Sequence, residues 1–317
     1  MKNYLGSEIP GMVEPVEQIM LESVAKNMIF EPGDSVVEFG TFFGRSTACL
    51  SAGLKANSSF TSECKFNAYD SFECDIKGGF YPYVTSFAKN SGVENLLEIS
   101  DGKVNFLPVF KHYLAAHINS AILAPQKAEL SDSFHKAGRI KIMHIDSPKF
   151  YKEFKVILFR FFPHLKEGSV VIFQDFFYHW SASVIAVCGL MMKEGLLTPE
   201  RSAASSLVCT INKKFDADQI AEIELKMENG SIPELIDCAT QFVDKIELDR
   251  REAFKPRLVL AKIQWLFEEG NYSLATEEFV KFFNSGGSLN DSIINDFLEL
   301  MNNGFSIRQL YEKDHKA

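Results

Sequence analysis

The sequence predicts an α/β fold: a doubly wound, mostly parallel sheet with helices on both faces, followed by an all-helical C-terminal extension. Up to residue 216, strand-like apolar runs alternate with helical patterns, an order typical of βαβ units. These runs lack strict alternation of apolar and polar residues, as expected of strands that are covered on both faces. Beyond residue 216 the patterns are helical throughout.

The first predicted elements are a helix, a strand and a second helix. Apolar positions recur at helical spacing over residues 14–29, and a Pro-Gly turn follows them. The short run Ser35–Phe39 predicts a strand, and "GRSTACLSAGL" after it has helical character. Further strands are predicted in "FNAYDSF", "LLEISDG", "RIKIMHID" and "GSVVIFQDF", and a helix is predicted in "FYKEFKVILFRFFPHL".

Changes in pattern divide the chain into two predicted domains. We place the α/β domain at residues 1–216, with residues 111–138 as an insertion and 205–215 as the last strand of the sheet. Residues 217–317 form the helical region. Within it, "LAKIQWLFEEGNYSLATEEFVKFF" predicts two helices joined through Gly270-Asn271-Tyr272, similar to a single tetratricopeptide-type hairpin.

Composition and charge exclude several classes of function. The 317 residues are 46% hydrophobic and carry a net charge of −9, which argues against a nucleic-acid-binding surface. The six cysteines form no CxxC pair, so a reduced, cytoplasmic setting is expected. The first residues lack the apolar segment of a signal peptide, and no apolar run approaches membrane-spanning length, so no membrane association is expected.

A glycine-containing turn follows the first predicted strand. In "VVEFGTFFGRST" the strand ends at Glu38, the turn carries Gly40 and Gly44, and a helix opens after it. Glycines allow a ligand close to the backbone, and free amides at a helix start favour an anionic group. The glycines equally suit a turn that serves packing alone. The spacing is not that of G-x-G-x-x-G or of a P-loop, which disfavours a nicotinamide cofactor.

A second acidic residue ends the next predicted strand, in "AYDSFE". Asp70 is suited to accept hydrogen bonds from two ribose hydroxyls. Two acids that end successive strands beside a glycine turn therefore favour a ligand that contains adenosine.

These segments, in this order, resemble class I S-adenosylmethionine-dependent methyltransferases, and more narrowly the macrocin O-methyltransferase-like group of small-molecule O-methyltransferases. "IPGMVEPVEQ" resembles the substrate-side N-terminal segment of that group, "VVEFGTFFGRST" its cofactor loop, and "AYDSFE" its ribose-binding strand end. "MHIDSPKFYKEFKVILFRFFPHLKEGSVVIFQDF" resembles its later strand–helix–strand block. The resemblance covers roughly residues 8–215 and implies a Rossmann-like, seven-stranded sheet.

The resemblance also implies which residues hold the cofactor, S-adenosylmethionine. Its methionine part would contact residues of the glycine turn, and its ribose would contact the end of the next strand. Asp101 and Gly102 fall where the family holds the adenine. The complete predicted set is Glu38, Gly40, Thr41, Gly44, Ser46, Asp70, Ser71, Phe72, Asp101 and Gly102.

Many relatives bind a divalent cation with the Asp that ends the later strand and a polar pair that ends the following one. Here the candidate ligands for Mg²⁺ are Asp146, Gln174 and Asp175, all of which offer oxygen. Catechol-type relatives carry a lysine three residues after the first metal ligand, and "DSPK" places Lys149 there. The resemblance implies that Lys149 accepts the proton of the acceptor hydroxyl, with Asp146 as its catalytic neighbour.

Two departures from the family pattern bear on this site. Pro148 stands where a second acid is usual, and Gln174 is neutral where charge is expected, which weakens binding of a hard cation. The site therefore works either with two carboxylates and an amide on the metal, or without metal. In a purely structural interpretation, Asp146 caps the following helix, Pro148 occupies its first turn and Lys149 is solvated.

The sequence thus predicts an O-methyltransferase that acts on a hydroxyl of a small molecule: a sugar, a catechol-like ring or a natural-product intermediate. Met12, His179 and Trp180 are the predicted acceptor contacts. The alternative is a catalytically degenerate methyltransferase-like protein that binds or scaffolds. A homo-oligomer is expected from the resemblance, and the helical tail is a candidate site for another protein.

Overall fold

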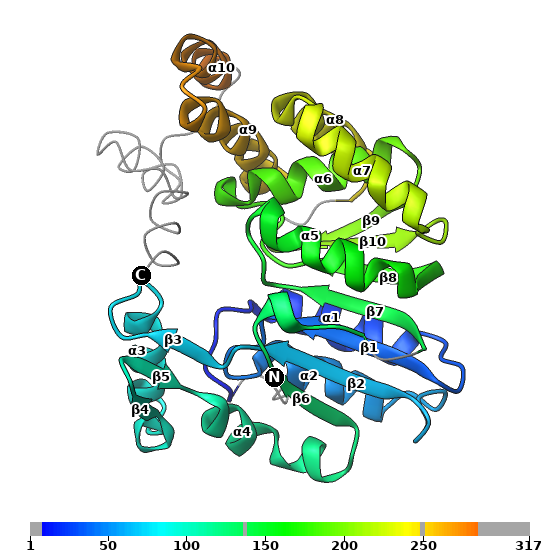
Figure 1. Cartoon of the computed structure of the whole chain (residues 1–317), viewed down its shortest axis with the longest axis vertical. Coiled ribbons are helices and arrows are strands. Elements are labelled where there is room, and N and C mark those ends of the chain that lie inside the picture. The colour runs from blue at the N-terminus through cyan, green and yellow to red at the C-terminus, as the bar shows by residue number, and fades with distance from the viewer. Residues whose placement is uncertain (1–7, 136–137, 248–250, 285–317) are drawn as a thin grey trace. The chain divides into compact units, whose positions relative to one another are not determined.

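A computed structural model describes residues 8–135, 138–247 and 251–284 of the chain (Figure 1). Seven strands form one sheet in the order β6-β2-β1-β7-β8-β10-β9, which confirms the predicted fold class. Their bounds are β1 Asp34–Phe39, β2 Lys65–Asp70, β6 Leu123–Lys127, β7 Arg139–Ile145, β8 Leu165–Phe173, β9 Leu197–Ala203 and β10 Ser206–Ile211.

The central strands are parallel and buried. β1 pairs with β2 on one side and with β7 on the other, and β2 pairs with β6, all in parallel register. Every residue of β1 is buried, and Val36 and Val37 are fully enclosed. β-branched side chains on both faces suit a strand that is covered on both sides, which explains the missing alternation in the sequence.

The edge strand beside β2 differs from the sequence prediction. "LLEISDG" contains β4 (Glu98–Ser100), which pairs with β5 (Lys103–Asn105) in a separate small sheet with β3 (Glu73–Asp75). β6 takes the edge position instead, and it lies within the 111–138 segment predicted as an insertion. A short run such as β6 (LAPQK) carries little strand signal, because only pairing with β2 holds it extended.

The order at the other end of the sheet also differs from the prediction. The predicted last strand is β10, the last strand of the described chain, but the edge of the sheet is formed by β9, which pairs with it antiparallel. β9 was not predicted, since its residues "LTPERSA" include a proline and two charges. α1 Pro15–Asn27 precedes β1, and the α-helices between the strands are α2 Arg45–Lys55, α3 Tyr81–Asn90, α4 Leu107–Asn119, α5 Tyr151–Arg160 and α6 Ala182–Lys193.

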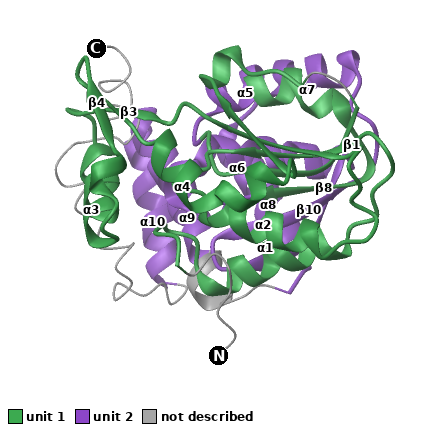
Figure 2. Cartoon of the chain, turned by 90° about the horizontal axis from the view of Figure 1, so that it is seen from below, with its two compact units in different colours: residues 1–148, 156–172 green, residues 149–155, 173–317 purple. Residues whose placement is uncertain are grey.

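The chain divides into two compact units (Figure 2). The first comprises residues 1–148 and 156–172, and the second comprises 149–155 and 173–317. This division differs from the predicted boundary near residue 216. The helical tail belongs to the same compact unit as β9 and β10, and its described helices are α7 Ala217–Asn229, α8 Ile232–Val243, α9 Arg251–Glu268 and α10 Tyr272–Asn284.

Close packing joins the tail to α6 within the second unit. α6 packs against α8, and a Cβ added at Gly189 of α6 would lie 2.1 Å from the backbone oxygen of Leu235. Only glycine allows the two backbones to approach this closely. α8 begins where the Ser231 side chain accepts a hydrogen bond from the amide of Glu234, and Pro233 follows in the first turn.

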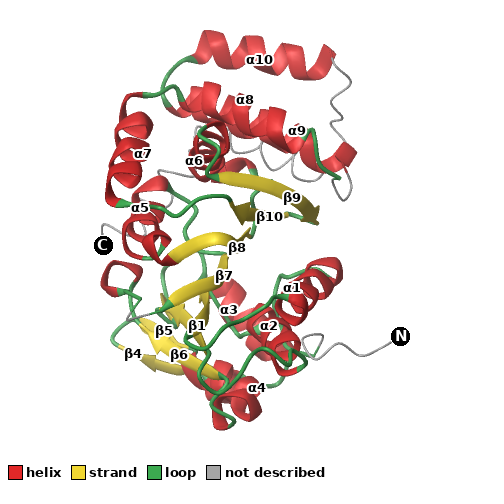
Figure 3. Cartoon of the chain, turned by 90° about the vertical axis from the view of Figure 1, so that its right-hand side faces the viewer, coloured by secondary structure: helices red, strands yellow, loops and turns green. Residues whose placement is uncertain are grey.

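The last two described helices form the predicted hairpin. α9 packs against both α8 and α10 (Figure 3). α9 ends at Glu268, Gly270 with φ +78° lies in the turn after it, and α10 begins at Tyr272. The hairpin core is apolar and consists of Leu260, Ile263, Leu266, Ala275 and Phe282.

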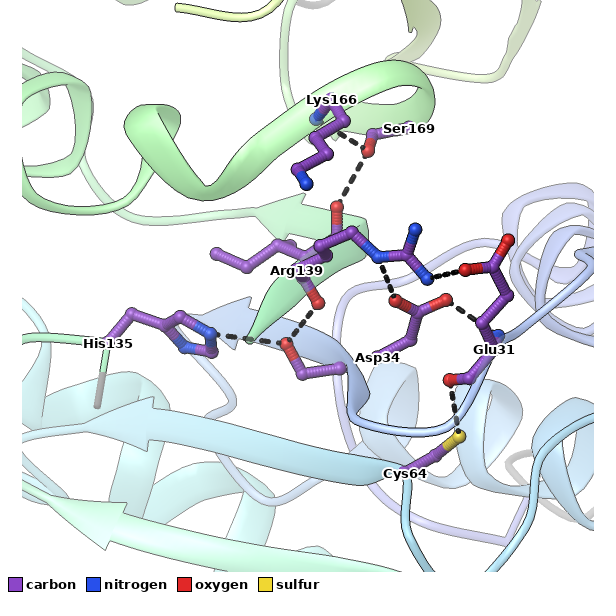
Figure 4. Close-up of polar contacts among 9 residues, drawn as sticks. Glu31, Asp34, Cys64, His135, Arg139, Lys166 and Ser169 are labelled. Carbon is purple, nitrogen blue, oxygen red and sulfur yellow. Dashed lines mark hydrogen bonds and ion pairs between the residues drawn. The ribbon is translucent and has the colours of Figure 1, made fainter. Parts of the chain in front are cut away.

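A polar network ties together the amino ends of β1 and β7 (Figure 4). Asp34, which is almost fully buried, accepts a hydrogen bond from Arg139 Nε at 2.7 Å, and Glu31 also pairs with Arg139. Ser35 Oγ donates to the backbone oxygen of Arg139 at 3.0 Å. Since parallel strands begin at the same edge, this network lies at the opposite edge from the glycine turn and serves the fold. Among the described residues, no helix is long and apolar enough to cross a bilayer.

Candidate active site

The glycine turn lies at the carboxyl ends of three neighbouring strands. The Gly40 amide donates to the Tyr69 oxygen at 3.0 Å, and the Phe39 oxygen accepts from the amides of Asp146 and Ser147. Gly40 has φ +79°, and an added Cβ would lie 2.8 Å from the Ser147 nitrogen. Both the positive φ and this close approach require glycine. The turn is therefore fixed against the ends of β2 and β7.

Asp70, at the end of β2, is held by backbone amides. Its Oδ2 accepts from the amides of Thr41 at 2.8 Å and Phe42 at 3.0 Å, and its Oδ1 accepts from the Phe72 amide at 2.7 Å. Burial raises the pKa of Asp70 above its usual value, although these amides and the Thr41 hydroxyl oppose the shift. The carboxylate is fixed relative to the glycine turn, and Oδ1 keeps capacity for a further donor.

Glu38 is fully buried and bonded to side chains of the protein. Its Oε2 accepts from the Thr47 hydroxyl at 2.6 Å, and its Oε1 lies 3.0 Å from His144 Nδ1. The three side chains are each 0% exposed. The sequence predicted Glu38 as a cofactor contact; the structure gives it a role in joining β1, β7 and α2. Direct contact with a ligand stays a prediction.

The remaining residues of the predicted cofactor set line the same strand ends. Gly44, with φ +96°, precedes the first residue of α2, and Ser46 is almost fully buried in its first turn. Ser71 Oγ donates to the Glu73 oxygen, and the Phe72 side chain is fully buried. Free backbone amides at the start of α2 suit an anionic group.

Aromatic side chains pack around the turn, a feature that was not predicted from the sequence. Phe42 stacks on Phe43 with ring centroids 4.0 Å apart. It also contacts the rings of Phe80, Phe87 and Phe106 at 5.4–5.8 Å. Phe42 therefore joins the glycine turn to α3 and to the start of α4. The unusual number of phenylalanines was the only signal in the sequence.

Asp101 and Gly102, the predicted adenine contacts, lie in the small sheet. They form the two-residue turn between β4 and β5, with φ +50° and +76°, and both are exposed. Positive φ at both central residues is the requirement of a tight hairpin turn, which explains the Asp-Gly pair. The adenine contact was predicted from the family resemblance and stays a prediction, although the segment lies in the small sheet and not in the seven-stranded one.

The predicted catalytic lysine forms an ion pair within the second unit. Lys149 Nζ donates to Asp175 Oδ2 at 2.8 Å, and both side chains are partly exposed, at 29% and 23%. Asp175 Oδ1 accepts from the Ser205 hydroxyl at 3.0 Å. Lys149 is therefore not simply solvated. α5 begins only at Tyr151, so Pro148 precedes the helix rather than occupying its first turn.

The predicted metal ligands have protein partners. Gln174 Oε1 accepts from the Ser206 hydroxyl at 2.9 Å, and Asp175 is held by Lys149 and Ser205. Asp146 belongs to the first unit, where its amide donates to Phe39. In the described part of the chain, no three His, Cys, Asp or Glu side chains gather in a group that would hold a metal ion.

The predicted acceptor contacts lie in two places. His179 is 1% exposed, and burial, with a smaller contribution from the Arg257 charge, lowers its pKa to about 4. Trp180 is half-buried and stacks on Tyr178, with centroids 4.5 Å apart and planes 6° apart. Met12 is 57% exposed, in the other compact unit.

Arg45 holds the segment that contains Met12. Arg45 Nε donates to the Ile9 oxygen at 2.6 Å, and Nη1 donates to the Val13 oxygen at 3.3 Å. Ile9 and Val13 are buried on either side of the exposed Met12. This anchor was not predicted, because a lone arginine after a glycine turn carries no signal for the carbonyls it meets.

Comparison with known proteins gives one family match. Residues 37–176 match a family described as a methyltransferase domain. The match spans the glycine turn, Asp70, Lys149 and Asp175, and it ends before the helical tail. A comparison with curated protein sequences gives no match.

Several solved structures resemble the chain. CalS11, a TDP-rhamnose 3'-O-methyltransferase of calicheamicin biosynthesis, is 14% identical over 62% of this chain and 81% of its own, with a TM-score of 0.40. The O-methyltransferase NovP is 16% identical over 63% and 79%, with a TM-score of 0.42. A putative caffeoyl-CoA O-methyltransferase from Staphylococcus aureus is 12% identical over 64% and 86%, with a TM-score of 0.39. Likeness at this level carries no information on the acceptor.

Proposed function

Because residues 37–176 match the methyltransferase-domain family, we propose that the chain is an S-adenosylmethionine-dependent O-methyltransferase that modifies a hydroxyl of a small molecule. The observation that carries this proposal is the fixed position of Asp70. Three backbone amides, two of them from the glycine turn, hold its carboxylate at the carboxyl edge of the sheet. Nucleoside ligands of doubly wound sheets bind at this edge, where a strand-end acid accepts from ribose hydroxyls.

The residues present fit such a cofactor. Asp70 is half-buried and keeps acceptor capacity on Oδ1, as two ribose hydroxyls require. The start of α2, after Gly44, provides backbone amides for a carboxylate such as that of a methionine group. When bound, the cofactor would supply an electrophilic methyl group on a sulfonium centre. All the predicted contacts except Asp101 and Gly102 lie in or beside the glycine turn or at the end of β2.

Lys149 is the residue to which we assign the proton of the acceptor hydroxyl. Lys149 Nζ, as the neutral amine, would accept the proton of the acceptor hydroxyl when that oxygen takes the methyl group; the sulfonium–methyl bond would break and leave S-adenosylhomocysteine. The Asp175 carboxylate at 2.8 Å then stabilises the ammonium that results.

The predicted magnesium ion is not needed for this chemistry and stays a separate prediction. Its proposed ligands Asp146, Gln174 and Asp175 include only two carboxylates, and a hard cation requires charge to offset its dehydration. A cation and the Lys149 ammonium would also compete for the Asp175 carboxylate. The residues thus fit a metal poorly, and we derive no step through one. Dialysis against EDTA followed by an activity assay decides this point, because fully retained activity would rule out the predicted magnesium ion.

The other predictions about partners are also proposals. A sugar, catechol-like or natural-product hydroxyl remains the proposed acceptor class, and Met12, His179 and Trp180 remain its proposed contacts. Homo-oligomer formation, a cytoplasmic setting and a protein partner for the tail stay predictions as well. Size-exclusion chromatography with light scattering tests the first of these directly.

Calorimetric titration with S-adenosylhomocysteine tests the cofactor site. We expect binding to the wild-type protein, no binding of nicotinamide dinucleotide, and at least tenfold weaker binding to Asp70→Asn. Asp132→Asn is the matched control, because it makes the same change at an exposed position outside the predicted cofactor set. It should change the affinity less than twofold.

Two outcomes would change the conclusion. Failure of the wild-type protein to bind S-adenosylhomocysteine would rule out the proposed function. Binding without methyl transfer to any of a broad panel of sugars, catechols and hydroxylated aromatic compounds would favour the catalytically degenerate alternative.

A further inference from the structure

Helix α9 lies outside the methyltransferase-domain match, yet it packs against the short 3-10 helix His179–Ser181. That helix follows Gln174 and Asp175 closely along the chain. Both elements belong to the second compact unit, as does Lys149. The tail therefore contacts the turn that leads from Gln174 and Asp175 to α6.

Arg257 makes the contact through its guanidinium. Its Cζ lies 5.3 Å from the centroid of the Tyr178 ring, and Tyr178 stacks in turn on Trp180 at 4.5 Å. The two rings are nearly parallel, at 6°. A cation over an aromatic face is attracted by the ring, more strongly where water is excluded. Arg257 thus restrains a pair of half-buried aromatic rings.

The restrained turn is bonded back to Asp175. The Tyr178 amide and the Ser181 hydroxyl both donate to the Asp175 backbone oxygen at 3.1 Å, and the Ser181 amide donates to the Tyr178 oxygen at 3.0 Å. Asp175 itself has φ +57°, a left-handed conformation that a non-glycine residue keeps only where its surroundings hold it. Its side chain then meets Lys149.

We propose that Arg257 of α9 is a positioning residue for the methyl-transfer site, which holds the Tyr178–Ser181 turn and, through it, the backbone of Asp175 and the Lys149 amine. The helical tail is then part of the catalytic unit. The catalytic part of this inference rests on the proposed function, whereas the restraint on the turn does not.

Arginine suits this position better than lysine. The planar guanidinium stacks on a ring face, whereas an ammonium is a compact and strongly hydrated charge that stacks poorly. Arg257→Lys keeps the charge and should therefore weaken the restraint only partly. Arg257→Leu removes both the charge and the planar group while keeping an apolar side chain for the helix.

Trp180 fluorescence provides a direct measure of the restraint. The chain has two tryptophans, so Trp265→Phe leaves Trp180 as the only emitter. In that background we expect Arg257→Leu to increase the acrylamide quenching constant of Trp180 at least twofold, with Arg257→Lys intermediate. Hydrogen exchange of the amides at 175–181 should accelerate at least tenfold in Arg257→Leu.

The matched control is Lys281→Met on α10, which removes an exposed cation from the same tail but has Glu277 and Glu278 as its partners. It should leave quenching and exchange unchanged. S-adenosylhomocysteine affinity should stay within twofold of wild type in every variant, because the proposed ribose contact lies on β2. Circular dichroism identifies any variant that fails to fold. If Arg257→Leu fails to fold, the test relies on Arg257→Lys.

The outcomes separate this inference from the proposed function. Unchanged Trp180 quenching and unchanged exchange in folded Arg257→Leu or Arg257→Lys would overturn the positioning role, whatever the cofactor result. A loss of S-adenosylhomocysteine binding in the folded Arg257 variants would also contradict it, because the effect would then reach the cofactor site. If the wild-type protein does not bind S-adenosylhomocysteine, the proposed function is overturned, but the measured restraint of the turn by Arg257 still stands.

Discussion

The two compact units hold their strand-end carboxylates by different means. In the first unit, Asp70 is fixed by three backbone amides, and Glu38 is enclosed with Thr47 and His144 at 0% exposure. In the second unit, Asp175 is held by a lysine and a serine side chain and is about a quarter exposed.

This difference follows from where each acid sits in the fold. Backbone amides of a turn cannot move away without unfolding the turn, so Asp70 is preorganised for its ligand. A partly exposed ion pair is screened by water and contributes little to stability, so it is able to rearrange during a reaction. The Asp70 carboxylate, proposed to bind the cofactor, is thus expected to be held rigidly, whereas the Lys149–Asp175 ion pair is expected to be adjustable.

The largest expected effect is on catalysis. Lys149→Met removes the proposed proton acceptor and should lower turnover by about 10²–10⁴-fold, the usual contribution of a general base. The affinity for S-adenosylhomocysteine should change less than twofold. Steady-state rates with an acceptor found by screening hydroxylated compounds measure the first effect, and calorimetry measures the second. Unchanged turnover would show that Lys149 is not the proton acceptor.

A single methyl group added in the glycine turn of the first unit should lower the free energy of unfolding strongly. Gly40→Ala adds a Cβ 2.8 Å from the Ser147 nitrogen at φ +79°, and strain together with overpacking should cost about 3 kcal/mol. Gly92→Ala is the control, because Gly92 also has positive φ, +66°, but nothing lies within 4 Å of its added Cβ. It should cost about 1 kcal/mol. Urea unfolding measures both, and equal losses would show that the turn is not tightly packed.

The buried histidine of the second unit should make stability depend on pH. His179 has a folded-state pKa of about 4, against an ordinary pKa of 6.5 for an exposed histidine. The unfolded chain therefore binds more protons between these values, and the free energy of unfolding falls as the pH is lowered through that window. From pH 7 to pH 5 the loss should be about 2 kcal/mol. His179→Gln should remove most of it in urea titrations at the two pH values, and an unchanged pH dependence would contradict the assignment.

The smallest expected effects come from removing one hydroxyl donor from Glu38 in the first unit or from Asp175 in the second, and they compare the two units most directly. Thr47→Val removes a hydroxyl that donates to the fully buried Glu38 at 2.6 Å, and should cost about 2 kcal/mol because a buried carboxylate loses its donor. Ser205→Ala removes the corresponding donor to Asp175, where water can replace it, and should cost less than about 1 kcal/mol. Thermal or urea unfolding measures the stability lost in each variant. Equal losses would argue against a difference in rigidity between the two carboxylates.

The central βαβ core was predictable because its signal is local. The buried run of β1 and the glycine pair after it indicate a strand and a turn from a dozen consecutive residues. Helix α9 and helix α10, with Gly270 at their junction, were equally predictable. The edge strand β6 and the antiparallel strand β9 were not, because short polar runs become strands only through their partners.

Within the site, the residue types were predictable and their partners were not. Asp70, Lys149 and Asp175 stand out in the sequence as polar residues at strand ends. Glu38 stands out in the same way, yet the structure encloses it with His144 and Thr47. A ligand role was also predicted for Asp101 and Gly102, whereas their backbone angles are those of a hairpin turn.

The amino-acid sequence by itself determined the class of fold, the position of the glycine turn and the acids that follow it, because apolar periodicity and glycine act over a few residues. Only the tertiary structure decided which strand lies beside β2, which acids are enclosed, and that Arg257 reaches Tyr178 from a distant helix. These outcomes depend on contacts between segments that are far apart in the chain, and such contacts leave no local pattern.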